Sequence, residues 1–165
     1  MKAPQMKRTA LKLCLLVLGV ASATACSSTT LERTGQGEAL VTSAADRVAY
    51  DFFVAKGLTK FQSAGIVGNL DQESQMNPGA VQPGGPGRGI AQWSAGGRWD
   101  ADGNDNAVWY AATRGQSVGT LNLQLEFIWY ELQTFPAFGL AQLRQTTNLR
   151  DAVLVFEDKF EQCGG

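Results

Sequence analysis

The feature that most constrains the fold is a set of apolar residues at helical spacing, bounded by residues that start and stop helices. The first set follows Thr42 and Ser43, which are suitable N-cap residues, and it ends before Gly57. Its apolar positions are Ala45, Val48, Ala49, Phe52 and Phe53. These five positions share one face of a helix, and such a face must be buried against another element. We therefore predict a first helix that ends at Gly57.

Further helices follow along the chain. Thr59 and Gln62 have the spacing of a capping box and predict a second helix that runs to about Ser74, where Asn77-Pro78 ends it. Residues 105–112 fit a short helix. Leu149, Ala152, Val153, Phe156 and Phe160 form the apolar face of a last helix, with Asn148 as its cap and Gly164 as its stop.

Residues 120–133, TLNLQLEFIWYELQ, are ambiguous between strand and helix. The segment begins with strict alternation, but its length and its few β-branched residues favour a helix. Its apolar residues point nearly all round, as in a helix buried in the middle of a domain. Residues 77–104 hold Pro78, Pro83, Pro86 and many glycines, which indicate loops. The sequence thus predicts a mainly α fold with one loop-rich side.

Residues 1–25 have the pattern of an export leader. A basic start precedes the apolar run of residues 13–21 and the small residues Ala23-Thr24-Ala25. Cys26 follows directly, and this arrangement resembles the lipidation site of bacterial lipoproteins. We expect a membrane-anchored lipoprotein, with ordinary cleavage and secretion as the alternative. A disulfide between Cys26 and Cys163 is conceivable only if Cys26 carries no lipid.

The chain then divides into two further parts. The polar residues 26–41 read as a flexible tether, and residues 42–165 as one domain. Removing the leader takes away four basic residues and no acidic one, which changes the formal charge from −1 to −5. No basic stripe favours nucleic acid, so we expect no nucleic-acid partner.

The chain contains no histidine, which excludes several kinds of active site. Ser-His-Asp and Cys-His nucleophiles and imidazole metal sites are all impossible. We expect no metal and no cofactor. The segment DADGNDN, residues 100–106, lacks the glycine and the closing glutamate of an EF-hand, and GGPGRG lacks the Lys-Ser/Thr ending of a nucleotide loop. Carboxylates with shifted pKa values are therefore the leading candidates for acid–base work.

Glu73 is the best candidate among the carboxylates. On a helix it shares a face with Ile66 and Leu70, whereas Asp71 points almost the opposite way, so the two acids are not a dyad. Partial burial and the C-terminal end of a helix both raise the pKa of a carboxyl. The alternative is an ordinary exposed glutamate. Gly65 and Gly68 in the same helix suggest that another helix or a backbone segment approaches closely.

Several motifs follow one another in the order Glu73-Ser74, Asn77-Pro78 with Ala80, a glycine-rich loop, and Gly89-Ile90-Ala91-Gln92-Trp93. Together they resemble the phage tail lysozyme family, and the resemblance runs from about Asp46 to the C-terminus. Lytic transglycosylases and goose-type lysozymes are more remotely similar. The resemblance implies a lysozyme-like fold with a loop-rich substrate cleft. It also implies cleavage of the β-1,4 bond between N-acetylmuramic acid and N-acetylglucosamine, with Glu73 as the acid and Gln92 lining the active site.

Trp93 and Arg98 are additional candidates for substrate binding. An exposed indole can stack on a sugar ring, and a guanidinium can hold a muramyl or peptide carboxylate. Core packing of Trp93 and a solvent-facing Arg98 are the alternatives. Asp100 and Asp102 are the nearest candidates in sequence for a second carboxylate that activates water, and neither can be assigned.

The sequence therefore predicts a monomeric peptidoglycan glycosidase whose partners are the glycan strands of the wall, with the membrane reached only through the lipid anchor. Two other functions stay open. One is a non-catalytic peptidoglycan-binding lipoprotein. The other is a lytic transglycosylase, which would leave anhydro sugar ends instead of adding water.

Overall fold

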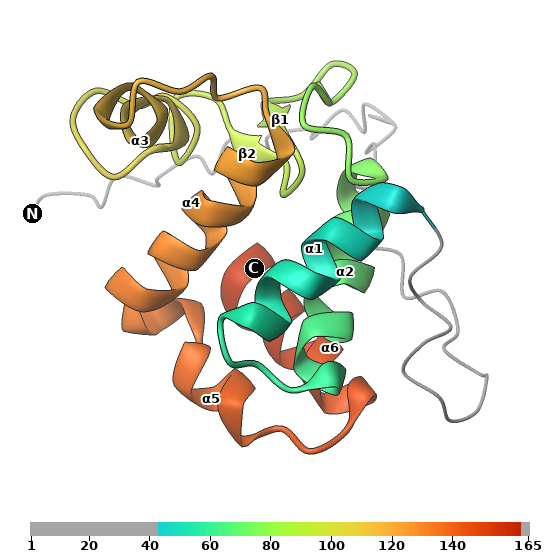
Figure 1. The fold of residues 1–165 in the computed structure, drawn as a ribbon. Coiled ribbons are helices and arrows are strands. Elements are labelled where there is room, and N and C mark those ends of the chain that lie inside the picture. The colour runs from blue at the N-terminus through green and yellow to red at the C-terminus, as the bar shows by residue number, and fades with distance from the viewer. Residues whose placement is uncertain (1–42, 163–165) are drawn as a thin grey trace, which may run out of the picture. The chain divides into compact units, whose positions relative to one another are not determined.

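The computed structural model of the chain describes residues 43–162, and these form a mainly helical domain (Figure 1). The mainly α lysozyme-like fold predicted from the sequence is thereby confirmed. The predicted leader (1–25), the tether (26–41) with its lipidation site at Cys26, and the cysteine at position 163 lie outside the described residues. Within residues 43–162, no helix is long and apolar enough to cross a membrane.

The elements follow in the order α1 (Ala44–Ala55), α2 (Lys60–Ser74), β1 (Gly87–Arg88), β2 (Trp93–Ser94), α3 (Ala107–Thr113), α4 (Leu121–Thr134), the 3₁₀ helix η1 (Pro136–Phe138), α5 (Leu140–Gln145), α6 (Leu149–Phe156) and the π-helical turn η2 (Glu157–Glu161). The two short strands pair antiparallel, with Gly87 opposite Ser94 and Arg88 opposite Trp93.

The predicted helix starts are confirmed by their hydrogen bonds. The Ser43 hydroxyl oxygen accepts from the backbone N–H of Asp46 at 3.1 Å, and the Asp46 carboxylate accepts from the backbone N–H of Ser43 at 2.8 Å. Thr59 and Gln62 form the same reciprocal pair at the start of α2. Between the two helices, Gly57 adopts φ +87°, a left-handed conformation that favours glycine.

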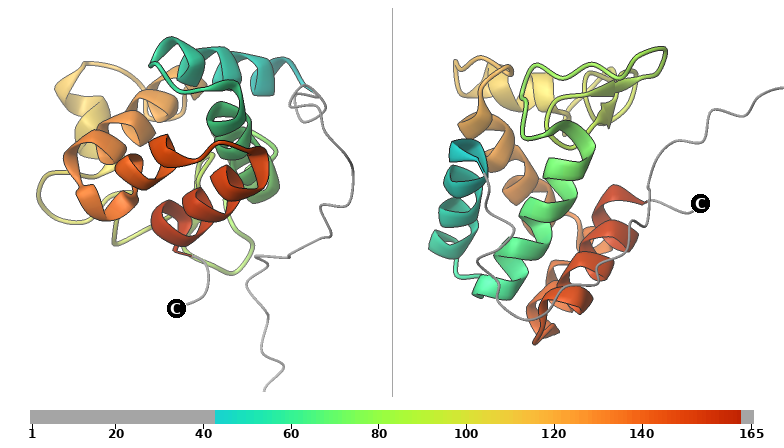
Figure 2. Two further views of the ribbon diagram at one scale, coloured as in Figure 1. Left: turned by 90° about the horizontal axis from the view of Figure 1, so that it is seen from below. Right: turned by 90° about the vertical axis from the view of Figure 1, so that its right-hand side faces the viewer.

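Helix α2 lies between α1 and α6, with the loop-rich side of the domain at its C-terminal end (Figure 2). Gly65 allows α6 to approach closely, because a Cβ atom there would lie 2.8 Å from the Ala152 side chain and 2.9 Å from the Val153 nitrogen. The Asn69 amide bridges the same contact by donating to the carbonyls of Gly65 and Val153. The close approach predicted from Gly65 is confirmed.

Helix α4 runs through the core, as its apolar surface predicts. Leu123, Leu125, Phe127 and Ile128 are completely buried. Phe127 contacts the rings of Trp93 and Tyr110 at centroid distances of 5.4 and 5.3 Å. The helical alternative for residues 120–133 is therefore confirmed, and the alternation at the start of the segment is incidental.

Three elements differ from the sequence prediction. η1 and α5 were not predicted, and they are joined through Gly139 at φ +79°. The last helix was predicted as one helix with Gly164 as its stop, but it changes from α to π geometry at Glu157, and Gly164 lies outside the described residues. The Phe160 carbonyl in this turn accepts a hydrogen bond from Arg98, 62 residues earlier. A contact between such distant segments has no signal in the local helical pattern.

We predict that Gly65→Ala lowers the free energy of unfolding of the domain, although the helix propensity of alanine is about 1 kcal/mol more favourable than that of glycine. The added methyl would overlap the α6 backbone, and overpacking of this kind costs about 1–3 kcal/mol. Urea denaturation of the variant and of Gly119→Ala checks this, because a Cβ at Gly119 meets only ordinary contacts. A Gly65→Ala protein as stable as the wild type would contradict the tight α2–α6 contact.

Candidate active site

Glu73 lies in the last turn of α2 and is partly buried. The helix ends immediately after it, where Gln75 and Met76 both adopt left-handed conformations, at φ 54° and 55°. Such conformations are unfavourable for residues with a Cβ. Met76 is only 1% exposed, so its burial in the core offsets part of this cost. The sharp end of α2 leaves Glu73 next to the loop-rich side of the domain.

The surroundings of Glu73 disfavour its charged form. Burial raises the pKa of the Glu73 carboxyl, and the negative charge of Glu157 raises it further. Asp71 has different surroundings: burial raises its pKa, with a further contribution from Asp46 on α1. The two acids therefore face different neighbours and form no dyad, as the helical spacing predicts.

The glycine-rich loop is fastened to the end of α2. The Ser74 hydroxyl lies 2.9 Å from the carbonyl oxygen of Ile90 in this loop, as well as 3.2 Å from that of Leu70 in its own helix. Gln92 follows two residues later at φ 46°, and its side-chain amide donates to the Gly89 carbonyl at 2.9 Å. Gln92 is partly exposed, and the Ser74–Ile90 hydrogen bond holds its loop to the segment that carries Glu73.

Gln124 of α4 also holds this loop, and sequence reasoning missed it. Its buried amide accepts from the backbone N–H of Ile90 at 2.8 Å and donates to the carbonyls of Pro78 and Val118 at 2.8 and 2.7 Å. Gly89 makes room for it, because a Cβ there would lie 2.7 Å from the Gln124 oxygen. The missed signal is a polar residue in a helix that is apolar nearly all round.

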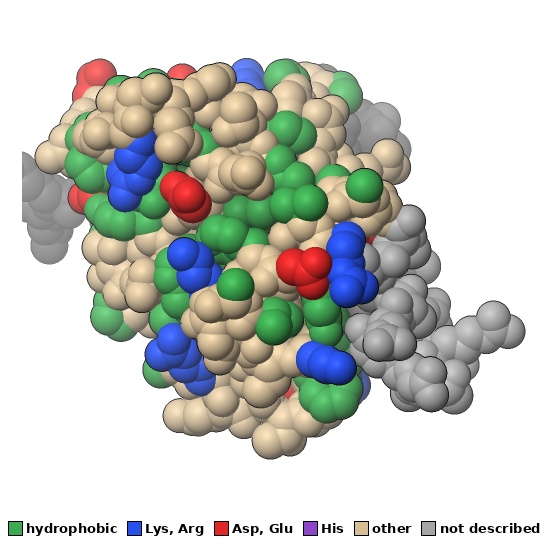
Figure 3. All heavy atoms as spheres, viewed as in Figure 1, with side chains coloured by type: hydrophobic (Ala, Val, Ile, Leu, Met, Phe, Trp, Pro, Cys, Tyr) green, Lys and Arg blue, Asp and Glu red, His purple; other side chains and the backbone are tan. Residues whose placement is uncertain are grey.

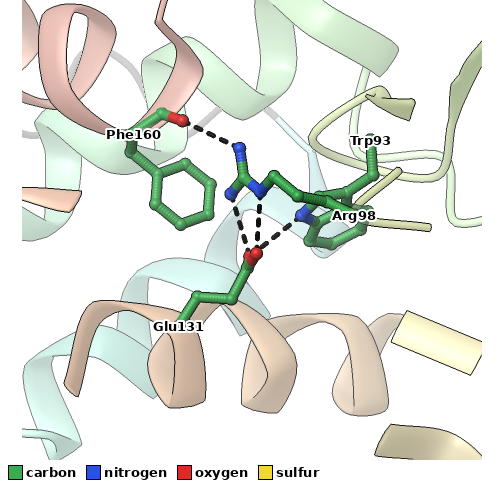
Figure 4. A network of polar contacts seen from close by, with 4 residues as sticks. All are labelled: Trp93, Arg98, Glu131 and Phe160. Carbon is green, nitrogen blue, oxygen red and sulfur yellow. Dashed lines mark hydrogen bonds and ion pairs between the residues drawn. The ribbon is translucent and has the colours of Figure 1, made fainter. Parts of the chain in front are cut away.

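Arg98, Glu131 and Trp93 form a buried polar network (Figure 4). The Arg98 Nε and Nη2 atoms donate to the two oxygens of Glu131 at 2.7 and 2.9 Å, and the Trp93 indole N–H donates at 3.0 Å. Burial raises the pKa of Glu131, while Arg98 and the Trp93 N–H oppose this shift. Glu131 lies seven residues after Gln124 on the same side of α4, and its role too was missed.

The positions of Trp93 and Arg98 in this network contradict the substrate contacts that the sequence predicted for them. Trp93 is only 2% exposed, so its ring faces core residues and cannot stack on a sugar. Arg98 also donates to the Phe160 carbonyl at 2.9 Å, and its guanidinium lies 4.4 Å from the ring centroids of Phe138 and Phe160. Three of its N–H donors are therefore engaged within the protein. The structure favours core packing for Trp93 and a structural ion pair for Arg98.

A further carboxyl, Glu161, lies close enough to this region to interact with it electrostatically. Its Oε1 atom is buried and has no hydrogen-bond partner among residues 43–162. Burial raises the pKa of Glu161 well above its usual value, with further contributions from Glu73 and Glu131, whereas Arg98 lowers it. Sequence reasoning missed Glu161, because a glutamate near the chain end resembles an ordinary surface residue.

The two candidates that the sequence offered for a second carboxylate lie in a polar turn. Asp100 accepts a hydrogen bond from the backbone N–H of Gly96 at 2.7 Å, and Asp102 is exposed. Neither contributes to the pKa shift of Glu73. Asn106 ends this turn by capping α3, since its side-chain oxygen accepts from the Trp109 N–H at 2.8 Å.

A cavity of about 290 Å³ lies elsewhere, between α1, α3 and α4, with Lys56, Arg114 and Glu126 in its lining. Its lining includes none of the residues predicted for the active site. On the face of the domain shown in Figure 3, basic and acidic side chains are scattered among hydrophobic ones. This face carries no continuous basic patch.

We predict that Glu131→Gln destabilises the domain by about 3–5 kcal/mol, because the variant leaves the Arg98 charge without its buried partner. The double variant Arg98→Met with Glu131→Gln should recover part of this loss, since it removes both charges. Urea denaturation of the two single variants and the double variant measures the coupling. Additive effects of the two substitutions would contradict the network.

The comparisons with known proteins agree with this architecture. The sequence model of the phage tail lysozyme family matches residues 44–165, which include Glu73, Gln92, Glu131 and Glu161. None of the curated proteins compared with the sequence matches it. The family points in general to a lysozyme-like function in the degradation of peptidoglycan. Since the match spans more than half of the chain and the whole described domain except its first residue, the protein belongs to the phage tail lysozyme family.

Proposed function

We propose that the protein is a peptidoglycan glycosidase that cleaves the β-1,4 bond between N-acetylmuramic acid and N-acetylglucosamine, with Glu73 as general acid. The observation that carries the proposal is the position of Glu73. It is partly buried at the C-terminal end of α2, beside the negative charge of Glu157, and both features raise its pKa. A carboxyl that keeps its proton near neutral pH can donate it to a leaving oxygen.

The proposed chemistry starts from the protonated form of the Glu73 carboxyl. Glu73 donates its proton to the glycosidic oxygen as the bond between that oxygen and the anomeric carbon breaks. In hydrolysis, water then adds to the anomeric carbon and releases one proton, which restores the acid. Lysozyme-type sites commonly pair the acid with a second carboxylate, or use a group of the substrate itself. The Gln92 side chain, on the loop fastened to α2, has the role of orienting the sugar or the water.

The place of action follows from the substrate. Peptidoglycan lies outside the cytoplasmic membrane, and we propose that the leader of residues 1–25 exports the protein to it. Lipidation of Cys26 would then keep the domain near the membrane, on a tether of residues 26–41. We propose that the partners are the glycan strands of the wall and that the domain acts as a monomer.

We predict that Glu73→Gln abolishes the loss of turbidity of purified cell walls, because glutamine keeps the shape of the side chain but cannot donate the proton. The rate should fall by at least about 10²-fold, the usual contribution of general acid catalysis. Thermal stability should change little, since Glu73 is only partly buried. Asp71→Asn is the matched control: it neutralises a carboxyl two residues away that faces α1, and it should leave the rate unchanged.

The products distinguish the proposed function from its alternatives. Mass spectrometry of the released fragments should find reducing sugar ends, whereas a transglycosylase would yield anhydro ends that weigh one water less. Binding of the protein to insoluble walls without any released fragments would identify a non-catalytic wall-binding protein. If Glu73→Gln lyses walls at the wild-type rate, Glu73 is not the acid.

A further inference from the structure

The cavity between α1, α3 and α4 has no role in the proposed function. Helix α4 packs against both α1 and α3 (Figure 1) and lines the cavity with residues spaced i, i+3, i+4 and i+7, namely Glu126, Trp129, Tyr130 and Gln133. At about 100° per residue, these four positions form one stripe along the helix. Gln124 and Glu131, which hold the loop-rich side of the domain, lie on the opposite side of α4 by the same spacing. The cavity is therefore separate from the candidate active site.

Aromatic residues line the cavity and are fixed in place. Tyr110 is 5% exposed and Trp129 is 8% exposed. The Tyr110 hydroxyl donates to the backbone carbonyl of Glu126 at 3.2 Å, and the ring centroids of Tyr110 and Tyr130 lie 5.1 Å apart. Stacking on a sugar needs an open ring face, which the buried rings of Tyr110 and Trp129 do not offer. They provide an apolar wall instead.

The charged residues of the lining have no charged partner in the described part of the domain. Lys56 ends α1 and Arg114 ends α3. The Lys56 ammonium lies 4.9 Å from the ring centroid of Phe52, and the Arg114 guanidinium lies 3.4 Å from that of Tyr110. Within the described part of the chain, neither cation forms an ion pair, and neither does Glu126. Two cations and one anion thus line one cavity without a direct ion pair between them.

This set of groups selects a class of ligand. A carboxylate can bind Arg114 and Lys56, and an amine can bind Glu126. The glutamate disfavours a purely anionic ligand such as phosphate, and the two cations disfavour a purely cationic one. The volume of about 290 Å³ lies at the lower end of the range of about 300–1,000 Å³ that is typical of small-molecule sites. A small molecule with a carboxylate, an amine and an apolar part meets all three conditions.

We propose that this cavity binds a short peptide, and that the peptide is a stem peptide of peptidoglycan. Arg114 and Lys56 bind its carboxylate, Glu126 binds its amine, and the Gln133 amide pairs with a peptide bond. The chemical class follows from the cavity alone, whereas the wall as its source rests on the proposed function. Stem peptides are short and carry carboxylates together with the amine of a diamino acid. A second contact with the wall raises the effective concentration of glycan at the active site.

The first test uses acetyl-lysyl-alanine, a blocked dipeptide with one side-chain amine and one terminal carboxylate. NMR titration should shift the Trp129 indole N–H and the Tyr110 ring signals, because both residues line the cavity. Acetylation of the side-chain amine, or amidation of the terminal carboxylate, should weaken binding about tenfold or more, as expected for the loss of a hydrogen bond between charged groups. Absent shifts, or equal affinities for the three peptides, would overturn the proposal.

Variants of the charged residues assign each end of the peptide. Arg114→Gln should weaken binding of the dipeptide about tenfold and leave the affinity for its amidated form unchanged, because that form has no carboxylate to lose. Glu126→Gln should do the same for the amine, with the acetylated form as the insensitive ligand. Arg150→Gln is the matched control, since Arg150 is an exposed arginine of α6 outside the lining. An equal loss in Arg150→Gln would show general charge attraction and contradict a built site.

The source of the peptide is tested on insoluble walls. Wild-type protein and Arg114→Gln are sedimented in the cold with intact walls, and with walls whose stem peptides an amidase has removed. Arg114→Gln should bind less than the wild type to intact walls, and the two proteins should bind equally to the stripped glycan. If the dipeptide binds but stripping the walls changes the binding of neither protein, the ligand is a free peptide and the assignment to the wall is wrong.

The failure of this inference differs from the failure of the proposed function, because the titration requires no catalysis. If Glu73→Gln is inactive on walls while the dipeptide does not bind, the inference is wrong and the function stands. If the dipeptide binds through Arg114 and Glu126 while Glu73→Gln lyses walls at the wild-type rate, the peptide site stands and Glu73 is not the acid.

Discussion

The contact between α2 and α6 is the constraint on which the rest of the domain depends. Glycine inside a helix costs about 1 kcal/mol relative to alanine. Gly65 is kept because the α6 backbone occupies the space that a Cβ would need, and Asn69 ties the two helices by hydrogen bonds. Glu73 lies in the last turn of α2, and η2 continues directly from α6. The packing of α6 against α2 therefore determines which groups surround Glu73.

The loop-rich side of the domain is held by buried side chains, because its sheet is too small to do so. β1 and β2 contribute only two residue pairs. Instead, α4 presents two polar residues seven positions apart. Gln124 binds three backbone segments, and Glu131 binds Arg98 and Trp93. Buried polar groups are costly unless each is paired, and paired groups fix a single arrangement. This explains how loops rich in glycine keep Gln92 next to the end of α2.

The sequence predicts what depends on local pattern and misses what depends on distant contacts. Helix starts at Ser43, Thr59 and Asn148 follow from capping residues, and the helix class of residues 120–133 follows from length and composition. Glu73 could be placed on the correct face because helical spacing fixes directions. Arg98, in contrast, looks like a solvent-facing or ligand-binding residue until the fold brings Glu131 to it. Arg98 and Glu131 are 33 residues apart in the sequence, so no local periodicity indicates that they pair.

In a chain without histidine, carboxyls are the leading candidates for acid chemistry, and burial or a neighbouring negative charge raises the pKa of a carboxyl. Under the proposed function, burial alone is a poor way to raise this pKa, since a general acid must stay accessible to a bulky glycan. Glu73 is accordingly only partly buried, and Glu157 supplies a second, charge-based contribution without closing the site. Such a contribution weakens as salt screens it, whereas desolvation does not. The two contributions to the raised pKa of Glu73 thus differ in their response to salt, and only the charge-based one comes from η2.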